Sequence, residues 1–443
     1  MKIVFISSRL HGDGLARMYL FRQMPTLSIH KLAFLTPDEW EIEIIDNDFA
    51  KINFDSAPDL VAISTTTPGA PEAYRISSEF RSRGSKTIIG GAHVSFQVEE
   101  ALRYTDCVVV GEADDIWTQI LSDFKNDRLR KIYDSHSPAD IENDHSPSLV
   151  EIPYNIPGFH VPVTQTTRGC PLSCSFCSVS ALNGNLIRHR PIKTVVDEIE
   201  KFFTSHPSLI NYLVFVDDNI TIDRKYAIEL FRAIKPLNLR WVSQTDIRIA
   251  VDKVLLREAV ESGLIASQIG FEAIQKEALD TEVSPAKGNW RKRYEEAIKI
   301  LHSRGVMVEG LFIFGMDLHE KDVFERTVEW ALENIVDVAQ FSIWTPFPGT
   351  KLFKNLKKEE RITAVDRDGR YKWERFDMTK VVFKPAKMTP GELENGFWQA
   401  YRDFYNSTSI FKRMRSWGWR NRKFMENICT FLANWSFKHC TGA

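Results

Sequence analysis

Short apolar runs separated by polar and helix-like stretches fill the first third of the chain. Between the third and fourth runs, the amphipathic stretch PEAYRISSEFRSRG predicts a helix. Buried parallel strands appear as continuous apolar runs because both of their faces are covered, so the pattern predicts a doubly wound α/β domain. The runs are KIVFISS, EIEIIDND, LVAISTT, KTIIGG and CVVVGE.

The residues that follow the last three runs are candidates for ligand binding, because such sheets bind ligands beyond the carboxyl ends of their strands. Small hydroxyl and glycine residues let a flat or phosphate-bearing ligand approach the backbone, and the same residues also form ordinary turns. The candidates are Ser64, Thr65, Thr66, Thr67, Gly90, Gly91, His93, Gly111 and Glu112.

Six further strand patterns alternate with amphipathic helix patterns in the middle of the chain. Residues 133–162 separate this series from the first and have the Ser, Pro, Asp and Asn content of a linker. From about Arg361 the alternation stops, and Thr389, Pro390 and Glu392 predict the start of a helix. The strand patterns are VTQTT, NYLVFVDDN, RWVSQTDIR, SQIGFEA, MVEGLFIFGMD and AQFSIWTPFPGT.

The length of 443 residues exceeds what one ordinary core covers, so several folded units are expected. We place an α/β domain at 1–132, a linker at 133–162, a second α/β domain at 163–360 and a mainly helical region at 361–443. The net charge of -2 gives no general attraction to nucleic acid. Six cysteines are too few for a disulfide framework in a chain of this size, which favours the reducing cytoplasm.

Half of the six cysteines lie within the eight residues from Cys170 to Cys177, with Cys174 between them. A structural zinc site needs four ligands, and His189 is the candidate for the fourth. A redox pair of Cys174 and Cys177 leaves Cys170 without a role. An iron–sulfur cluster held by three thiolates leaves one iron open for a substrate, which explains why only three thiols are present.

The spacing Cys-x3-Cys-x2-Cys after a strand resembles the radical S-adenosylmethionine superfamily. This resemblance implies a partial (βα)6 TIM-like barrel that binds a [4Fe-4S] cluster through Cys170, Cys174 and Cys177. The resemblance also implies that the cluster binds S-adenosylmethionine and cleaves it to a 5'-deoxyadenosyl radical, while the protein places the reactants and excludes water. Phe176 resembles the aromatic residue that packs near the adenine in this family.

The ends of the later strands resemble the family's S-adenosylmethionine motifs. FVDD resembles the segment that binds the methionyl amino group, SQTD the segment near the ribose, IGFEA the Gly-Phe-Glu-Ser segment, and GLFIFG the strand that contacts adenine. Ala273 replaces Ser in the third motif. Any one of these aspartates also suits a helix cap or a loop. The implied binding residues are Asp217, Asp218, Gln244, Asp246, Gly270, Glu272 and Gly315.

The first domain resembles the cobalamin-binding domain that precedes the barrel in many radical S-adenosylmethionine enzymes. The similar segments are LVAISTTTPGAPEAYRISSEFRSRG, IIGGAHVSF and CVVVGEAD. The Asp-x-His-x-x-Gly motif with the lower cobalt ligand is absent, since that region is SSRLHGDGLAR with His11. Either cobalamin binds without a protein histidine, or the domain keeps the fold alone. The implied cobalamin residues are Ser64, Thr65, Thr66, Gly90, Gly91, Gly111 and Glu112.

Two basic segments are candidates for substrate or membrane contact. Arg188 and Arg190 suit an anionic substrate group, or form a solvated basic turn. Between Phe411 and Ala443, seven Lys or Arg and one Glu give a charge of +6 among aromatic residues. This tail suits either peripheral contact with an inner membrane face or a helix packed on the barrel. The C-terminal region resembles hopanoid methylases and related lipid-tailoring enzymes, which implies a lipid or other small-molecule substrate.

The resemblance implies methyl transfer from cobalamin to an unactivated carbon, with a separate reducing protein as electron donor. The alternatives are a radical enzyme that does not methylate, such as an oxidative cyclase or a carbon–carbon coupling enzyme, and a metal-binding module without turnover. Radical methylthiolation needs three further cysteines upstream, where only Cys107 is present.

Overall fold

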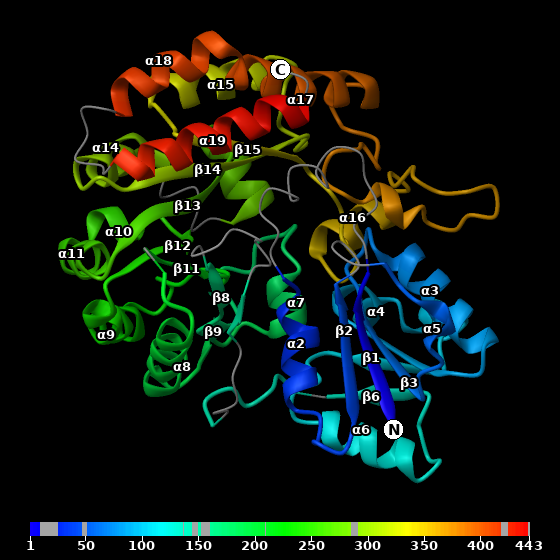
Figure 1. Ribbon diagram of the computed structural model, residues 1–443. Helices are drawn as coiled ribbons and strands as arrows, with labels where there is room; N and C mark the ends of the chain where they lie inside the picture. Colours follow the sequence, from blue (N-terminus) through cyan, green and yellow to red (C-terminus); the bar gives the residue numbers. More distant parts are fainter. Residues whose placement is uncertain are drawn as a thin grey trace.

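The chain folds into two parallel sheets side by side, with the C-terminal helices packed on the second sheet (Figure 1). The computed structural model describes residues 1–8, 25–46, 51–135, 137–143, 149–151, 160–208, 210–284, 291–417 and 424–441. Both sheets and the helical C-terminal part follow the predicted order along the chain, so the predicted fold class is confirmed.

The first sheet has six parallel strands in the order β2-β1-β3-β4-β5-β6. Alternate residues of a strand face opposite sides, and in β1 Ile3 and Phe5 pack toward α2 and α6, whereas Val4 and Ile6 pack toward α3 and α4. Because both faces are covered, these strands appear in the sequence as unbroken apolar runs. The elements are β1 (Lys2–Ser7), α2 (Leu27–Phe34), β2 (Glu41–Asp46), η1 (Phe54–Ser56), β3 (Leu60–Ser64), α3 (Ala70–Ser82), β4 (Lys86–Gly90), α4 (Ala92–Phe96), α5 (Val98–Ala101), β5 (Cys107–Val110), α6 (Trp117–Lys125) and β6 (Ile132–Asp134).

The second sheet is a partial barrel with the order β15-β14-β13-β12-β11-β8-β7. Strands β8 and β11 to β15 pair in parallel, as the six strand patterns predict, and β7 adds an antiparallel edge. The strands are β7 (Val150–Glu151), β8 (Pro162–Thr164), β11 (Asn211–Phe215), β12 (Leu239–Thr245), β13 (Leu264–Glu272), β14 (Met307–Phe314) and β15 (Val338–Ile343). The main helices are α8 (Ile192–Ser205), α9 (Arg224–Ile234), α11 (Lys253–Glu261), α14 (Tyr294–Ser303), α15 (Val323–Glu333) and α16 (Lys351–Lys358).

Short elements connect the barrel strands. A two-stranded antiparallel hairpin, β9 (Thr167–Arg168) with β10 (Arg188–His189), lies beside the loop that carries the clustered cysteines. The first sheet ends at Asp134 and the second begins at Val150, so the expected linker contributes a strand to the barrel. The domain boundaries stay predictions. The other short elements are α7 (Val179–Asn183), η2 (Lys235–Leu237), α10 (Arg248–Val251), α12 (Lys276–Ala278), η3 (Leu279–Val283), η4 (Arg291–Arg293) and η5 (Trp373–Arg375).

Three helices, α17 (Pro390–Tyr405), α18 (Ser407–Trp417) and α19 (Phe424–Thr441), complete the chain. α17 starts where the sequence predicts, because Thr389 and Glu392 form a reciprocal capping box. In α19, the Asn434 amide donates to the Asp337 carbonyl at 3.0 Å, and Phe437 stacks on Tyr405 at 5.0 Å. Among the described residues, no helix is long and apolar enough to cross a bilayer. Peripheral membrane contact stays a prediction, and residues 418–423 of the basic tail lie outside the described part.

Two tyrosines of α17 cover the free edge of the barrel sheet at β15. The Tyr405 hydroxyl accepts from the Ala339 N–H at 3.0 Å and donates to the Ala339 carbonyl at 2.7 Å. The Tyr401 hydroxyl does the same for Phe341, at 3.0 and 2.9 Å. Tyr401 and Tyr405 are four residues apart, which is about 6 Å along a helix, and Ala339 and Phe341 are two residues apart, which is about 6.6 Å along a strand. The tyrosines are therefore spaced like the backbone groups that they bind. The phenols therefore satisfy backbone groups that a further strand would otherwise bind.

The double variant Tyr401→Phe, Tyr405→Phe is expected to lose stability. Each substitution leaves a buried N–H and carbonyl of β15 without a partner, which costs about 1–3 kcal/mol per tyrosine. Urea unfolding followed by fluorescence measures the loss. Tyr371→Phe is the control, since that ring packs against Phe353, Trp373 and Phe376. Equal stability of the double variant and the control would show that the phenols do not support the edge.

Candidate active site

The clustered cysteines lie on the loop between β9 and α7. The loop is folded by its own backbone: the Cys170 N–H donates to the Gly184 carbonyl at 3.2 Å, and the Cys177 N–H donates to the Cys174 carbonyl at 3.2 Å. Gly169 has a φ of 92°, and a Cβ there would lie 2.1 Å from the Leu186 carbonyl oxygen. The tight entry to the loop therefore requires glycine at this position.

The barrel holds the same loop from the other side. The Ser175 N–H donates to the Val283 carbonyl at 3.2 Å, and the Ser175 carbonyl accepts from the Leu352 N–H at 2.9 Å. Phe176 is partly buried and packs against the barrel core. Contacts from Val283 at the end of η3 and from Leu352 in α16 thus fix the position of the loop that carries the three thiols. The expected contact of Phe176 with adenine stays a prediction.

The chemistry of the three thiols fits a polynuclear iron centre. Burial raises the pKa of Cys177 to about 12, and the negative potentials of Cys174, Asp218 and Cys170 act in the same direction. Positive iron relieves this cost when it replaces the protons, because metal-bound thiols are deprotonated. His189, the candidate for a fourth zinc ligand, lies 3.2 Å from Asp223.

Asp217 is committed to the strand that leads into the cysteine loop. Its carboxylate accepts from the N–H and hydroxyl of Thr166 at 3.1 and 2.7 Å. It also accepts from the N–H and hydroxyl of Thr167, both at 2.6 Å. The side chain is 2% exposed, and burial raises its pKa despite these hydrogen bonds. The geometry therefore indicates that Asp217 positions the loop. The sequence could not show this role, because Thr166 and Thr167 are about 50 residues away from Asp217 along the chain.

Asp218 presents the acceptor that the site offers to a cation. Its Oδ2 atom is buried and makes no hydrogen bond. Burial, followed by the charge of Asp217, raises the pKa of Asp218 to about 6, and Arg168 opposes the shift. An ammonium group beside Cys177 would stabilise the charged form of Asp218 against both its burial and the charge of Asp217. This orphaned carboxylate fits the methionyl amino group of S-adenosylmethionine.

The other implied S-adenosylmethionine residues lie along the carboxyl ends of neighbouring strands. Trp241 stacks on Phe231 of α9 outside the barrel, so Gln244, three residues later, faces the inside. Asp246 is held by Arg248 at 2.6 Å and by Asn219 at 2.7 Å. Their contacts with the cofactor stay predictions.

At two of these strand ends, a residue has a positive φ angle. β13 has a bulge between Gly270 and Glu272, where Glu272 takes a left-handed φ of 61°. Such strain in a residue other than glycine is typical of functional sites. Gly315 has a φ of 94°, and a Cβ there would lie 2.7 Å from Leu393 of α17. Packing against α17 thus explains this glycine, in addition to any contact with adenine.

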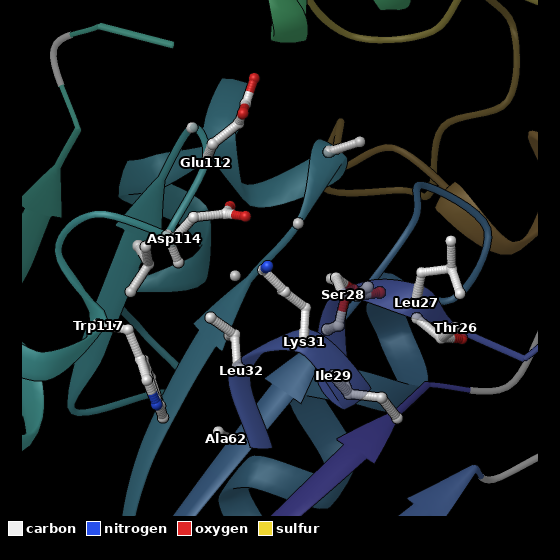
Figure 2. A pocket seen from close by; sticks show the side chains of 18 of the residues that line it. Thr26, Leu27, Ser28, Ile29, Lys31, Leu32, Ala62, Glu112, Asp114 and Trp117 are labelled. Atoms are coloured by element: carbon white, nitrogen blue, oxygen red, sulfur yellow. The ribbon is translucent and has the colours of Figure 1, made fainter. Parts of the chain in front are cut away.

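A cavity of about 350 Å³ opens between the first sheet and the helices α2 and α6 (Figure 2). Phe5, Ala62 and Trp117 form an apolar wall, and polar residues lie at the strand ends. His93, by contrast, is turned toward Trp373, with the ring centroids 4.9 Å apart. All the residues implied for cobalamin line the cavity: Ser64, Thr65, Thr66, Gly90, Gly91, Gly111 and Glu112.

The lining of this cavity fits a corrinoid. Asp114 is part of it, and the Asp114 Oδ1 atom is buried without a hydrogen bond, which suits an amide N–H of the ligand. The apolar wall suits a flat heterocycle. Gly91 has a φ of 105°, and a Cβ there would lie 2.4 Å from the Thr65 carbonyl oxygen, so the two strand ends approach closely. The segment with His11 lies outside the described residues. Cobalamin contacts of the single residues stay predictions.

An ion network joins this cavity to the cysteine loop. Arg168, two residues before Cys170, contacts Glu112 at 2.8 Å and Asp114 at 3.1 Å. Arg188 contacts Glu112 at 2.5 Å. Burial acts to lower the pKa of Arg168, and the two carboxylates outweigh it, so the pKa is raised. Glu112 therefore belongs both to the cavity lining and to the support of the cysteine loop.

The same network includes the two arginines that were candidates for substrate contact, and that contact stays a prediction. Arg188 donates to the Ala139 carbonyl at 2.5 Å in addition to its pair with Glu112. Arg190 is 4% exposed and pairs with Glu198 at 2.5 Å. Both guanidinium groups hold the hairpin β9–β10 to its surroundings. The partner of Arg188 is 76 residues away in sequence, whereas Arg190 pairs with Glu198, only eight residues further along the chain.

Glu112→Gln is expected to destabilise the protein by about 1–3 kcal/mol, because it leaves two partly buried guanidinium groups without their shared carboxylate. Urea unfolding measures the change. Glu99→Gln, an exposed residue of the same domain, is the control. A Glu112→Gln protein as stable as the control would mean that the network does not hold the domains together.

Two family models match the chain. The Radical SAM superfamily model matches residues 164–331, and the B12 binding domain model matches residues 26–121. The first match implies a [4Fe-4S] cluster and S-adenosylmethionine, and the second implies cobalamin, so the predicted cofactors are confirmed. Apart from Phe5, the lining of the cavity lies within these two matches, and so does the cysteine loop.

Relatives and solved structures agree with these matches. The chain is 29% identical to Bacteriochlorophyllide d C-12(1)-methyltransferase of Chlorobaculum tepidum, over 86% of this chain and 82% of that one. It is 28% identical to the C-8(2)-methyltransferase of the same organism, over 87% of each. In fold it is similar to the methyltransferase TsrM from Kitasatospora setae, solved with cobalamin and a [4Fe-4S] cluster, with 16% identity, a TM-score of 0.63 and coverage of 91% and 85%.

A second solved structure covers nearly the whole chain. The cobalamin-dependent radical enzyme OxsB has a TM-score of 0.68 at 13% identity and covers 97% of this chain and 70% of its own. Likeness at this level concerns the fold, and it spans both sheets described above. The chain therefore carries a Radical SAM domain at residues 164–331, preceded by a B12-binding domain at residues 26–121.

Proposed function

We propose that this protein is a cobalamin-dependent radical S-adenosylmethionine methyltransferase that acts on an unactivated carbon. The observation that carries the proposal is the shared network of Glu112 and Arg168, which joins the cavity of the first domain to the cysteine loop of the second. Two cofactor sites held together in this way suit a reaction that uses both. The methyltransferase names of the two Chlorobaculum relatives give it further support.

The residues of the chain have separate tasks in this reaction. When bound, the cluster and S-adenosylmethionine supply a 5'-deoxyadenosyl radical, and cobalamin supplies the methyl group. Asp218 holds the ammonium of S-adenosylmethionine beside the thiols, and Asp217 holds the loop that carries them. Arg168 keeps that loop against the cavity. Precise placement of this kind is the protein's main contribution to cofactor chemistry.

The proposed substrate is a small molecule with a large apolar skeleton. The relatives are named for bacteriochlorophyllides, and a more distant one, at 21% identity over 77% of this chain, is named Hopanoid C-2 methylase. A polycyclic lipid therefore belongs to the proposed substrate class beside tetrapyrroles. A reducing electron donor protein and a cytoplasmic location complete the proposal.

One relative favours a second candidate function. The chain is 27% identical to the Anaerobic magnesium-protoporphyrin IX monomethyl ester cyclase of Cereibacter sphaeroides, over 85% of this chain and 64% of that one. The second candidate is accordingly an oxidative cyclase, in which no methyl group is transferred. A metal-binding module without turnover is the third.

Product analysis with deuterated methyl groups separates these candidates. The anaerobically reconstituted protein is incubated with methyl-deuterated S-adenosylmethionine, a reductant, hydroxocobalamin, and a panel of tetrapyrroles and polycyclic lipids. Methyl transfer yields a deuterated product together with S-adenosylhomocysteine and 5'-deoxyadenosine. A cyclase yields 5'-deoxyadenosine and an unlabelled oxidised product. An intact cluster without either nucleoside product would leave only the non-catalytic module.

A further inference from the structure

Helix α16 presents a row of lysines to solvent. Its apolar side chains, Leu352, Phe353 and Leu356, are buried, and the positions between them are exposed. At about 100° per residue, the exposed positions fall on one side of the helix. We call this surface the lysine face, and its members are Lys351, Lys354, Lys357 and Lys358.

The stability of α16 does not explain the lysine face. Like charges three or four residues apart on a helix repel, as Lys354 does with Lys351 and Lys358. Lys351 also lies in the first turn, where the helix dipole disfavours a positive charge. The helix contains no acidic residue, and Glu359, which follows it, pairs with Arg361 at 3.0 Å. Within the described part of the chain, none of the four lysines forms an ion pair, so the face is open to an anionic partner.

The lysine face lies beside the loop that carries the clustered cysteines. The first turn of α16 contacts this loop directly, since the Leu352 N–H donates to the Ser175 carbonyl at 2.9 Å. Ser175 follows Cys174 in the sequence, and the exposed Lys351 precedes Leu352. A protein bound to the lysine face would therefore lie close to the cluster, and electron transfer between proteins requires a short distance between their redox centres.

The chemistry of this surface favours a redox protein over a membrane. The apolar side chains of α16 are buried in the core, so its exposed side offers charged and polar groups and nothing that would enter a lipid surface. A helix of eight residues gives a small area, below what a stable dimer needs and typical of transient redox complexes. Opposite charges raise the rate at which such partners meet.

We propose that the lysine face is the docking surface for the protein that reduces the cluster, and that this donor is a flavin or iron–sulfur protein with an acidic surface. In the step that it serves, the reduced donor loses one electron and the cluster gains it, while no bond forms or breaks. The inference rests on the proposed function, which needs a reducing partner, and adds where this partner binds and which surface charge it carries.

The rate of cluster reduction in the full reconstituted chain tests this surface. The two reductants are reduced flavodoxin, which is an acidic protein, and dithionite, which is too small to need a docking surface. In the double variant Lys354→Gln, Lys358→Gln, the rate constant for reduction by flavodoxin is expected to fall by about 10-fold at low ionic strength, because electrostatic steering is lost. The difference should shrink at high ionic strength, and dithionite should reduce the variant at the original rate. Stopped-flow absorbance of the cluster follows both reactions.

Lys253→Gln, Lys299→Gln is the matched control, since it removes two exposed lysines from α11 and α14 and should react like the original protein. An α16 variant that flavodoxin reduces as fast as the control would refute the docking surface. Equal slowing with dithionite would refute it too, because the substitutions would then act on the cluster itself. Loss of binding to phosphatidylglycerol vesicles with unchanged reduction by flavodoxin would make the lysine face a membrane contact instead.

Failure of the proposed function would give a different result. If dithionite reduces the cluster of the original protein and flavodoxin does not, the docking surface is refuted and the proposed methyl transfer is not. If the cluster reduced by dithionite forms no 5'-deoxyadenosine from S-adenosylmethionine, the proposed function fails. The dependence of reduction by flavodoxin on the lysines and on salt would still decide whether a donor docks on α16.

Discussion

Replacement of Cys170, Cys174 or Cys177 by alanine is expected to abolish reductive cleavage of S-adenosylmethionine. Each substitution removes one of the three thiolates that hold the cluster on a loop fixed from both sides. Formation of 5'-deoxyadenosine with dithionite as reductant, measured by liquid chromatography, should fall to the amount found in a reaction without protein. Iron content after anaerobic reconstitution gives an independent readout.

Cys440→Ala is the matched control, because this partly exposed cysteine lies in α19. It should keep its iron and its cleavage activity. Full cleavage in any one of the three loop variants would refute the assignment of the cluster. If the control also lost its activity, the loss in the loop variants would come from a disturbed fold and not from the missing cluster ligands.

Asp217→Ala is expected to lower the free energy of unfolding by about 3–5 kcal/mol, because two N–H groups and two hydroxyls lose their buried acceptor. These donors belong to Thr166 and Thr167, which lead directly into the cysteine loop. Urea unfolding measures the loss, and the iron content should fall with it.

Asp218→Ala is the natural comparison, since the two residues are neighbours with opposite environments. The Asp218 Oδ2 atom is buried without a hydrogen bond, so this substitution should change stability by less than about 1 kcal/mol. Its effect should instead appear as weaker binding of S-adenosylmethionine in a titration of the reconstituted protein. Equal loss of stability in both variants would show that the two aspartates do not divide their roles in this way.

The sequence pattern predicted the main strands well because burial on both faces leaves an unmistakable apolar run, as in β1 and β3. It missed β7, β9 and β10, because two residues are too few to show any period. Helix α2, with the sequence LSIHKLAF, was also missed, although Leu27, Ile29 and Leu32 of this helix line the cavity.

Motif spacing located the cysteine loop and the strand ends, because these are short-range features. It could not assign roles within them. Asp217 and Asp218 have the same chemistry, and only the positions of Thr166 and Thr167 distinguish the anchored carboxylate from the open one. The sequence pattern also could not show that Arg188 pairs with Glu112, a partner 76 residues away in sequence.

The tyrosine-covered edge of β15 also bears on how the protein can be divided or expressed. A shortened chain that ends before α17 would expose the backbone of Ala339 and Phe341 as an unpaired strand edge. Exposed edges of this kind pair with other copies and lead to aggregation. Helix α17 therefore acts as an intramolecular guard against self-association, and the C-terminal region has to be retained for soluble production whatever role it has in substrate binding.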